Sequence, residues 1–213
     1  MRAKTEDSRA AIRREALVVF CMRGYRATTL EEIGARVGVT RGAVLHHFVS
    51  KADLLQAVVA PFRGALTRLV DEARLNDPPT VQDQKQLLSA LVKLFLEHRA
   101  ALQLLVTDVA ARIQVGQLGE SATQIERLAT LLLGRRPNES DQIRTSAALG
   151  AMIQPVAFLG LELNTVSAQR ELVAAALAVL TRPATKSPKA SASPAAPAAH
   201  REQMARQLHA VVR

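Results

Sequence analysis

A small group of polar side chains around residue 41 has the chemistry to bind a polyanion. The Arg41 guanidinium can pair with the O6 and N7 atoms of a guanine, or with a phosphate. His46 and His47, five and six residues further along, can donate hydrogen bonds to a phosphate or a base edge. Gly42 and Ala43 are small enough to let a helix approach DNA closely. Each residue alone also fits a solvated surface, and it is their combination that favours nucleic acid.

Other polar residues of this region stand where helices are expected to begin. Thr28, Thr29 and Lys51 fall at predicted helix N-termini, where backbone N–H groups favour phosphate. Thr29, Thr40 and Ser50 are also ordinary capping residues, so their types alone do not separate a structural role from DNA binding.

No arrangement of residues in the sequence indicates catalysis or a metal site. Adjacent residues such as His46 and His47 do not face the same ion on a helix. We find no Gly-rich phosphate loop, Cys/His metal spacing or nucleophile elbow in the sequence. Cys21 stands in an apolar run, which favours a buried thiol over a redox sensor. We therefore expect no enzyme, no metal and no cofactor.

Helical periodicity and capping residues predict the elements that position these side chains. Residues 8–22 place apolar side chains at helical spacing, with Ser8 or Asp7 as the cap and Gly24 after the end.

The next two helices have the spacing of a helix-turn-helix. Thr29 and Glu32 match a capping box, and the helix that they open ends before Gly38. A second, shorter helix then ends near Phe48. A helix, a short Gly-containing turn and a second helix over residues 28–48 are typical of this DNA-binding motif.

The stretch from Gly24 to Leu55 resembles the DNA-binding domain of the TetR family of transcriptional regulators. The residues that carry the resemblance are Gly24, Tyr25, Thr28, Thr29, Ile33, Gly38, Val39, Thr40, Gly42, Phe48, Ser50, Lys51 and Leu54. Three residues depart from the family pattern, because Gly34 replaces an Ala, Ala43 a Thr and Leu45 a Tyr. The predicted DNA-binding residues are Arg26, Thr28, Thr29, Thr40, Arg41, Gly42, Ala43, His46, His47 and Lys51.

The resemblance implies an all-α dimer of roughly 200 residues, in which a helical bundle binds a small effector. The helical periodicity agrees, since it predicts segments at about 52–75 (interrupted by Pro61), 81–97, 100–115, 119–134, 139–163 and 167–181.

An effector pocket and a dimer interface are expected in these later helices. Candidate pocket residues are mostly apolar, which favours a small apolar ligand: Leu91, Phe95, His98, Leu102, Leu105, Met152, Gln154 and Phe158. Candidate interface residues lie on a small-residue helix face and an almost wholly apolar helix: Ala147, Gly150, Ala151, Leu172, Ala176, Leu177 and Leu180. The alternatives are ordinary core packing for the first set and a helix folded onto its own bundle for the second. Pro155 is expected to kink the first interface helix.

Charge divides the chain of 213 residues into three parts. Residues 1–51 carry ten Lys and Arg against five Asp and Glu, whereas residues 52–181 carry twelve against thirteen. Residues 182–213 carry six against one. We predict a DNA-binding domain over 5–65, here called the head, with its helix-turn-helix at about 28–47. An effector-binding and dimerisation domain over 66–182, here called the body, follows, and then a Pro/Ala/Ser/Lys-rich, disordered tail over 183–213.

Composition excludes several classes of protein. Hydrophobic residues make up 48% of the chain, which is a globular composition, and the single cysteine favours a reducing compartment. The sequence shows neither a signal peptide nor a transmembrane stretch, so we expect a cytoplasmic protein without a membrane partner.

The sequence thus predicts a homodimeric repressor that is released from a palindromic double-stranded DNA operator by a small, mostly apolar effector. An activator of the same fold and a non-specific nucleoid-associated protein are the alternatives.

Overall fold

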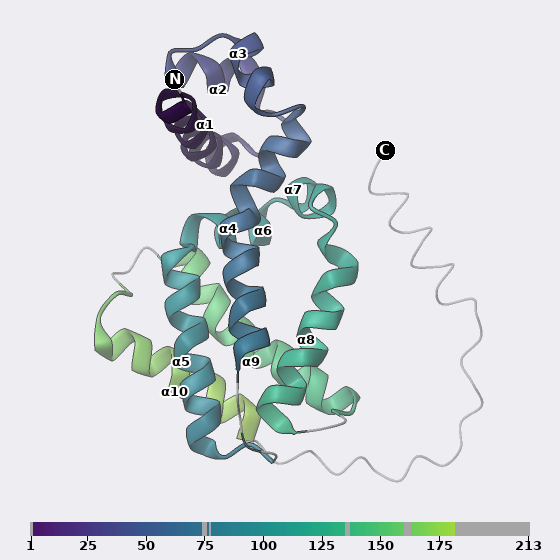
Figure 1. The fold of residues 1–213 in the computed structure, drawn as a ribbon. Helices are drawn as coiled ribbons and strands as arrows, with labels where there is room; N and C mark the ends of the chain where they lie inside the picture. Colours follow the sequence, from purple (N-terminus) through teal and green to yellow (C-terminus); the bar gives the residue numbers. More distant parts are fainter. Residues whose placement is uncertain (1, 74–75, 77, 135–136, 160–162, 182–213) are drawn as a thin grey trace, which may run out of the picture. The chain divides into compact units, whose positions relative to one another are not determined.

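The computed structural model describes residues 2–73, 76, 78–134, 137–159 and 163–181. All regular elements in that part of the chain are helices, as the all-α prediction requires (Figure 1). They are α1 (Arg2–Arg23), α2 (Leu30–Val37), α3 (Arg41–His47), α4 (Lys51–Glu72), α5 (Val81–Glu97), α6 (Arg99–Thr107), α7 (Val109–Gln114), α8 (Gln117–Leu133), α9 (Glu139–Phe158) and α10 (Val166–Thr181).

The helices of the head enclose a small apolar core. α1 packs against α2, α4 and α6, and α2 packs against α3. Ile12, Ala16 and Phe20 recur every fourth residue along α1, so they share one face, and all three are buried. Val44 from α3 and Phe48 after it are buried as well. The apolar period of the sequence therefore fixes which side of each helix faces inward.

The body is built from the later helices, with α10 packed on both α9 and α5, and α8 packed on α9. Its fully buried side chains include Leu88, Leu91, Leu104, Leu132 and Met152. Within the described residues, no helix combines the length and apolarity needed to span a bilayer.

The helix bounds differ from the prediction at both ends of the head. α1 begins at Arg2, so Asp7 and Ser8 lie inside the helix and do not cap it. α4 continues through Pro61 without the predicted interruption.

Two predicted helices of the body also change. The segment expected over 100–115 is two helices, because Asp108 has an extended backbone and its side chain caps α7. The segment expected over 139–163 ends at Phe158. Pro155 lies inside α9, in its last turn.

The structure bears on the predicted boundary between the head and the body but not on the predicted tail. The boundary predicted between residues 65 and 66 falls inside the continuous helix α4, so the head and the body share this element. The predicted tail over 183–213 lies outside the described residues.

Cys21 is not the buried core thiol that its apolar neighbours suggested. The residue is exposed on α1, and its Sγ lies 3.4 Å from the carbonyl oxygen of Ala100. Packing of the thiol against α6 partly removes it from water and raises the pKa of Cys21.

Candidate nucleic-acid interface

The turn between α2 and α3 is tight and is set by two glycines. Gly38 ends α2 in the left-handed region at φ 77°, which glycine adopts without a Cβ penalty. The Val39 amide then donates to the Gly34 carbonyl at 2.9 Å. A Cβ on Gly34 would lie only 2.7 Å from the Val39 carbonyl oxygen. Gly34 therefore lets the turn close onto α2, which fixes the direction of α3.

α3 has one buried and one exposed face. Val44 is fully buried, while Arg41, Gly42, Leu45 and His46 are exposed. Thr40 caps the helix, and its Oγ1 accepts a hydrogen bond of 3.2 Å from the Ala43 amide. The exposed face therefore presents a guanidinium, an imidazole and a glycine to solvent from one short, well-anchored helix.

Ala43 and His47 are half-buried at the edges of this face. The His47 ring lies 6.5 Å from the ring of Phe48, centroid to centroid. Both side chains therefore lie between the exposed face and the buried face of α3.

Arg41 is paired within the head. Its Nε lies 3.0 Å from Oε1 of Glu31 on α2, and both side chains are more than half exposed, at 59% and 60%. Exposed pairs of this kind contribute little to stability, about 0–1 kcal/mol. A phosphate or a base could therefore take the place of Glu31 at small cost.

The predicted capping box at Thr29 is only half formed. The Thr29 Oγ1 accepts from the Glu32 amide at 3.1 Å, as expected. The Glu32 carboxylate, however, accepts a hydrogen bond of 2.7 Å from Nη1 of Arg23. It therefore links the end of α1 to the start of α2. Thr29 is exposed, as is Arg26 in the preceding loop.

Two predicted DNA contacts have structural roles instead. Thr28 is buried, and its hydroxyl donates to the Gly24 carbonyl at 2.8 Å. The Lys51 Nζ donates to the carbonyl oxygens of Tyr25, Arg26 and Thr28 at 2.9, 3.2 and 2.9 Å. An ammonium group has three N–H donors, so these bonds occupy all of them. Both side chains are therefore engaged within the head, and we leave them out of the proposed DNA contacts.

Lys51 also lies over an aromatic ring. Its Nζ is 4.7 Å from the ring centroid of Tyr25, within the range of a cation–π contact. The Tyr25 ring packs in turn against Phe20, and partial burial raises the pKa of the Tyr25 phenol. Lys51 thus holds the loop between α1 and α2 in place from the first residue of α4.

Asp108, which is not among the residues predicted from the sequence, joins the head to the body. Its Oδ2 accepts a hydrogen bond of 2.5 Å from the Tyr25 amide, and its Oδ1 accepts one of 2.9 Å from the Ala111 amide. Asp is a favoured N-cap residue, so the residue type at position 108 was compatible with a new helix that begins there.

A cavity of about 380 Å³ lies in the body between α4, α5, α6, α7, α8 and α9. Three predicted pocket residues line it: Phe95, Leu102 and Leu105. The lining residues that the prediction did not include are Phe62, Arg63, Leu66, Val106, Arg112, Gln124, Ile125, Leu128, Ser146, Leu149, Gly150 and Ile153.

The other predicted pocket residues lie elsewhere. Leu91 and Met152 are fully buried core residues that do not line the cavity. His98 packs beside the Phe62 ring, 6.0 Å between centroids, and lines a smaller pocket near α1. Gln154 and Phe158 are exposed. The predicted residues lie on α5, α6 and α9 and at His98, whereas the cavity is lined from α4, α7 and α8 as well.

The predicted interface residues divide in the same way. Leu172, Ala176 and Leu180 are buried inside the chain's own bundle, so they are not available to a partner subunit. Leu177 is half-buried in a groove that also contains Lys85. On α9, Ala147 is exposed, whereas Gly150 and Ala151 are half-buried.

Residues 12–58 match the family model described as bacterial regulatory proteins, tetR family. The chain is 32% identical over 128 residues to the HTH-type transcriptional repressor BepR of Brucella suis, an alignment that covers 60% of each chain. It is 34% identical over 98 residues to the HTH-type transcriptional regulator TtgR of Pseudomonas putida, covering 45% of this chain and 47% of that one. The alignments with these curated relatives thus span about half of their length.

Solved structures share the fold over more of the chain. The structure of NalD, the secondary repressor of the MexAB-OprM multidrug efflux pump in Pseudomonas aeruginosa, matches 85% of this chain and 99% of its own. The TM-score is 0.63 and the identity 21%. The TetR-family regulator PfmR of Thermus thermophilus matches 79% of this chain and 96% of its own, with a TM-score of 0.60 and 18% identity.

Proposed function

We propose that the chain is a transcriptional repressor of the TetR type that binds a palindromic DNA operator, because residues 12–58 match the tetR family model and the chain is similar to the repressor BepR. A small effector in the body cavity releases it from that operator. The observation that carries the proposal is the exposed face of α3, which the closed Gly34–Gly38 turn holds away from the core. A helix held in this way can enter the major groove, where Arg41 meets base edges or phosphates.

The proposed DNA contacts follow from this geometry. Arg41, Gly42 and His46 contact the major groove directly. Ala43 and His47 lie at the edges of the exposed face of α3 and contact the groove from there. Arg26, Thr29 and Thr40 are exposed beside α3 and contact the phosphate backbone. Phosphate contacts of this kind set the position of the protein on the duplex, while base contacts set its specificity.

The Asp108 carboxylate supports coupling between the cavity and the head. One oxygen caps α7, on which Arg112 faces the cavity, and the other holds the Tyr25 amide. A ligand that moves α7 therefore pulls on the loop before α2. Both heads of a dimer must match half-sites about one helical turn apart, so a small change in head position abolishes binding.

We assign the dimer interface to the outward side of α9 and α10. Ile143, Ala147, Gln154 and Phe158 lie within one stripe along α9 and are all exposed. Ala174 and Ala178 are exposed on α10. Apart from Gln154, the side chains of this stripe are small or apolar, so the stripe permits close helix packing and is stabilised when it leaves water.

Selection from a random pool of double-stranded DNA tests the proposal. The full chain should enrich one short sequence with two-fold symmetry, since each head of the dimer reads one half-site. A pool that shows no common sequence after repeated rounds contradicts specific operator binding.

A further inference from the structure

We propose that the body cavity takes an organic anion, with an apolar part that fills the cavity and a carboxylate or similar oxyanion that binds Arg112. This inference rests on the proposed function in treating the cavity as the effector site. It changes the expected ligand class from mostly apolar to amphipathic and negatively charged.

The Arg112 side chain is the first feature of the cavity that favours an anionic ligand. Arg112 stands on α7 and lines the cavity. Its Nε is inaccessible to water and has no hydrogen-bond partner among the described residues. A buried N–H without an acceptor is unfavourable, and such groups are rare in folded proteins. A ligand oxygen inside the cavity would supply the missing acceptor.

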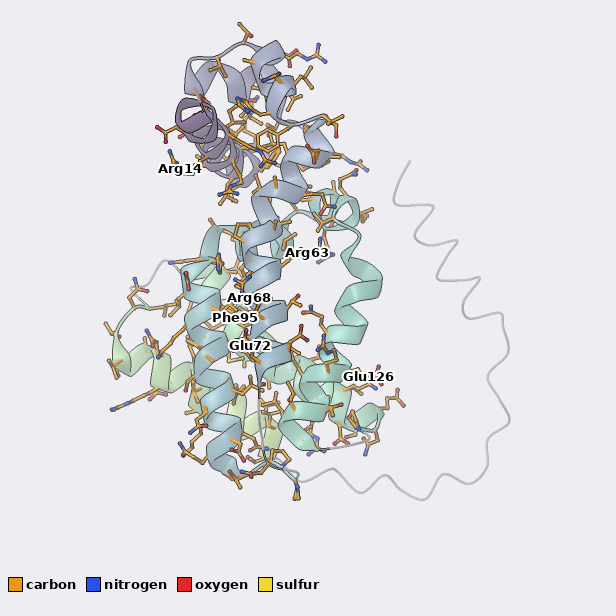
Figure 2. All side chains as sticks on the ribbon, viewed as in Figure 1. Arg14, Arg63, Arg68, Glu72, Phe95 and Glu126 are labelled. Carbon is orange, nitrogen blue, oxygen red and sulfur yellow. The ribbon has the colours of Figure 1, made fainter. Side chains whose placement is uncertain are left out.

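The charged side chains in the cavity wall are the second feature that favours an anionic ligand. Arg63 from α4, which Figure 2 labels, is a second guanidinium in the lining. Its Nη1 donates to Oε1 of Gln56 at 3.1 Å. Among the described residues that line the cavity, Arg63 and Arg112 are the charged ones. Charges in an apolar, partly enclosed space interact more strongly than in water. The Arg112 guanidinium, whose Nε lacks a hydrogen-bond partner among the described residues, therefore disfavours a cationic ligand and favours an anionic one.

The lining of the cavity also favours a ligand with one apolar part and one anionic end. Apart from Gln124 and Ser146, the remaining side chains of the lining are apolar, and Phe62 and Phe95 supply aromatic rings. A guanidinium forms two parallel hydrogen bonds with a planar oxyanion, which orients the ligand. A carboxylate at the α7 end, joined to a hydrocarbon or aromatic body, satisfies both parts of the cavity.

Two fluorescent probes that differ only in charge test the inference directly. Anilinonaphthalene sulfonate is an apolar ring system with an anionic group, and phenylnaphthylamine is the same ring system without it. Titration of the full-length protein should show tighter binding of the sulfonate. Arg112→Met should weaken sulfonate binding about tenfold, because it removes a charge-assisted hydrogen bond. Binding of the neutral probe should change less than about twofold, which also shows that the cavity remains folded.

Arg68→Met is the matched control, since Arg68 lies on α4, is exposed and does not line the cavity. It should leave both affinities unchanged, whereas Arg112→Lys, which keeps the charge, should retain part of the preference. Equal binding of both probes to the wild type, or an equal loss of both in Arg112→Met, would overturn the inference. Arg112-dependent binding without release of DNA would instead leave the inference standing and contradict the proposed effector role.

Discussion

Arg41 and Lys51, two cations of the head, lie in opposite environments. Arg41 is exposed and pairs with Glu31 on the surface, so DNA can reach it. Lys51 donates to three backbone carbonyls and lies over the Tyr25 ring. The sequence placed both near helix N-termini and predicted the same role for both. Only the packed loop distinguishes them.

Arg41→Ala should weaken binding to the selected operator by about 1–3 kcal/mol, because a bidentate contact to guanine is lost. Binding to unrelated DNA should change little. The free energy of unfolding should also stay nearly constant, since the Arg41–Glu31 pair is exposed.

Arg36→Ala is the control for this variant, because Arg36 forms a similar exposed pair with Glu15 but lies on α2. Operator affinities measured for both variants on specific and random DNA decide the role of Arg41. Equal weakening of Arg41→Ala on all sequences would make it a phosphate contact and not a base contact.

Lys51→Met should destabilise the head by about 1–3 kcal/mol, since three carbonyls lose a charged donor. The slope of log affinity against log salt should match that of the wild type, because no phosphate contact is removed. Thermal unfolding and a salt series measure the two quantities. A stable variant with a shallower salt slope would restore Lys51 as a DNA contact.

The caps of α3 and α4 could be predicted from residue type, whereas the cap predicted for α1 could not, because that helix begins earlier, at Arg2. Thr40 and Ser50 each accept a hydrogen bond from the amide three residues ahead, as their types and positions indicated. Residue type did not predict where a helical segment is interrupted. Pro61 leaves α4 continuous, whereas Asp108 divides a segment that periodicity alone joins. Tertiary contacts, such as the Tyr25 amide bonded to Asp108, decide these cases.

Asp108→Asn tests the link between α7 and the head. The Asn oxygen can still cap α7, but the amide nitrogen cannot accept a hydrogen bond from Tyr25. Hydrogen exchange at the Tyr25 amide should become at least about tenfold faster, while exchange at Ala111 stays slow. Protection at Tyr25 equal to that of the wild type would show that the carboxylate does not hold the loop.

At the scale of the whole molecule, the inward side of α10 was the hardest feature to predict. Residues 172–180 are almost wholly apolar, so no period distinguishes a core side from a partner side. The structure turns Leu172, Ala176 and Leu180 toward the chain's own core. Their neighbours Ala174 and Ala178 are exposed and line a groove together with Lys85 of α5. These three residues are therefore not available to a partner subunit, and the position of the dimer interface on α9 and α10 stays a prediction.

Ile143→Glu should produce monomers that remain folded. Ile143 is 61% exposed in the single chain, so a carboxylate there costs little until a second subunit would bury it. Val81→Glu is the control, since Val81 is 52% exposed at the start of α5, away from the stripe. Sedimentation should show a dimer for the control only. A dimeric Ile143→Glu would place the interface elsewhere.

A nuclease footprint of the full chain on a long DNA fragment that contains the selected sequence tests the central claim most directly. We expect one short protected region with two-fold symmetry, whose halves lie about one helical turn apart. Protection should appear there well before any other part of the fragment is covered. Even coverage of the whole fragment at the same protein concentration would contradict the claim and favour a non-specific nucleoid-associated protein.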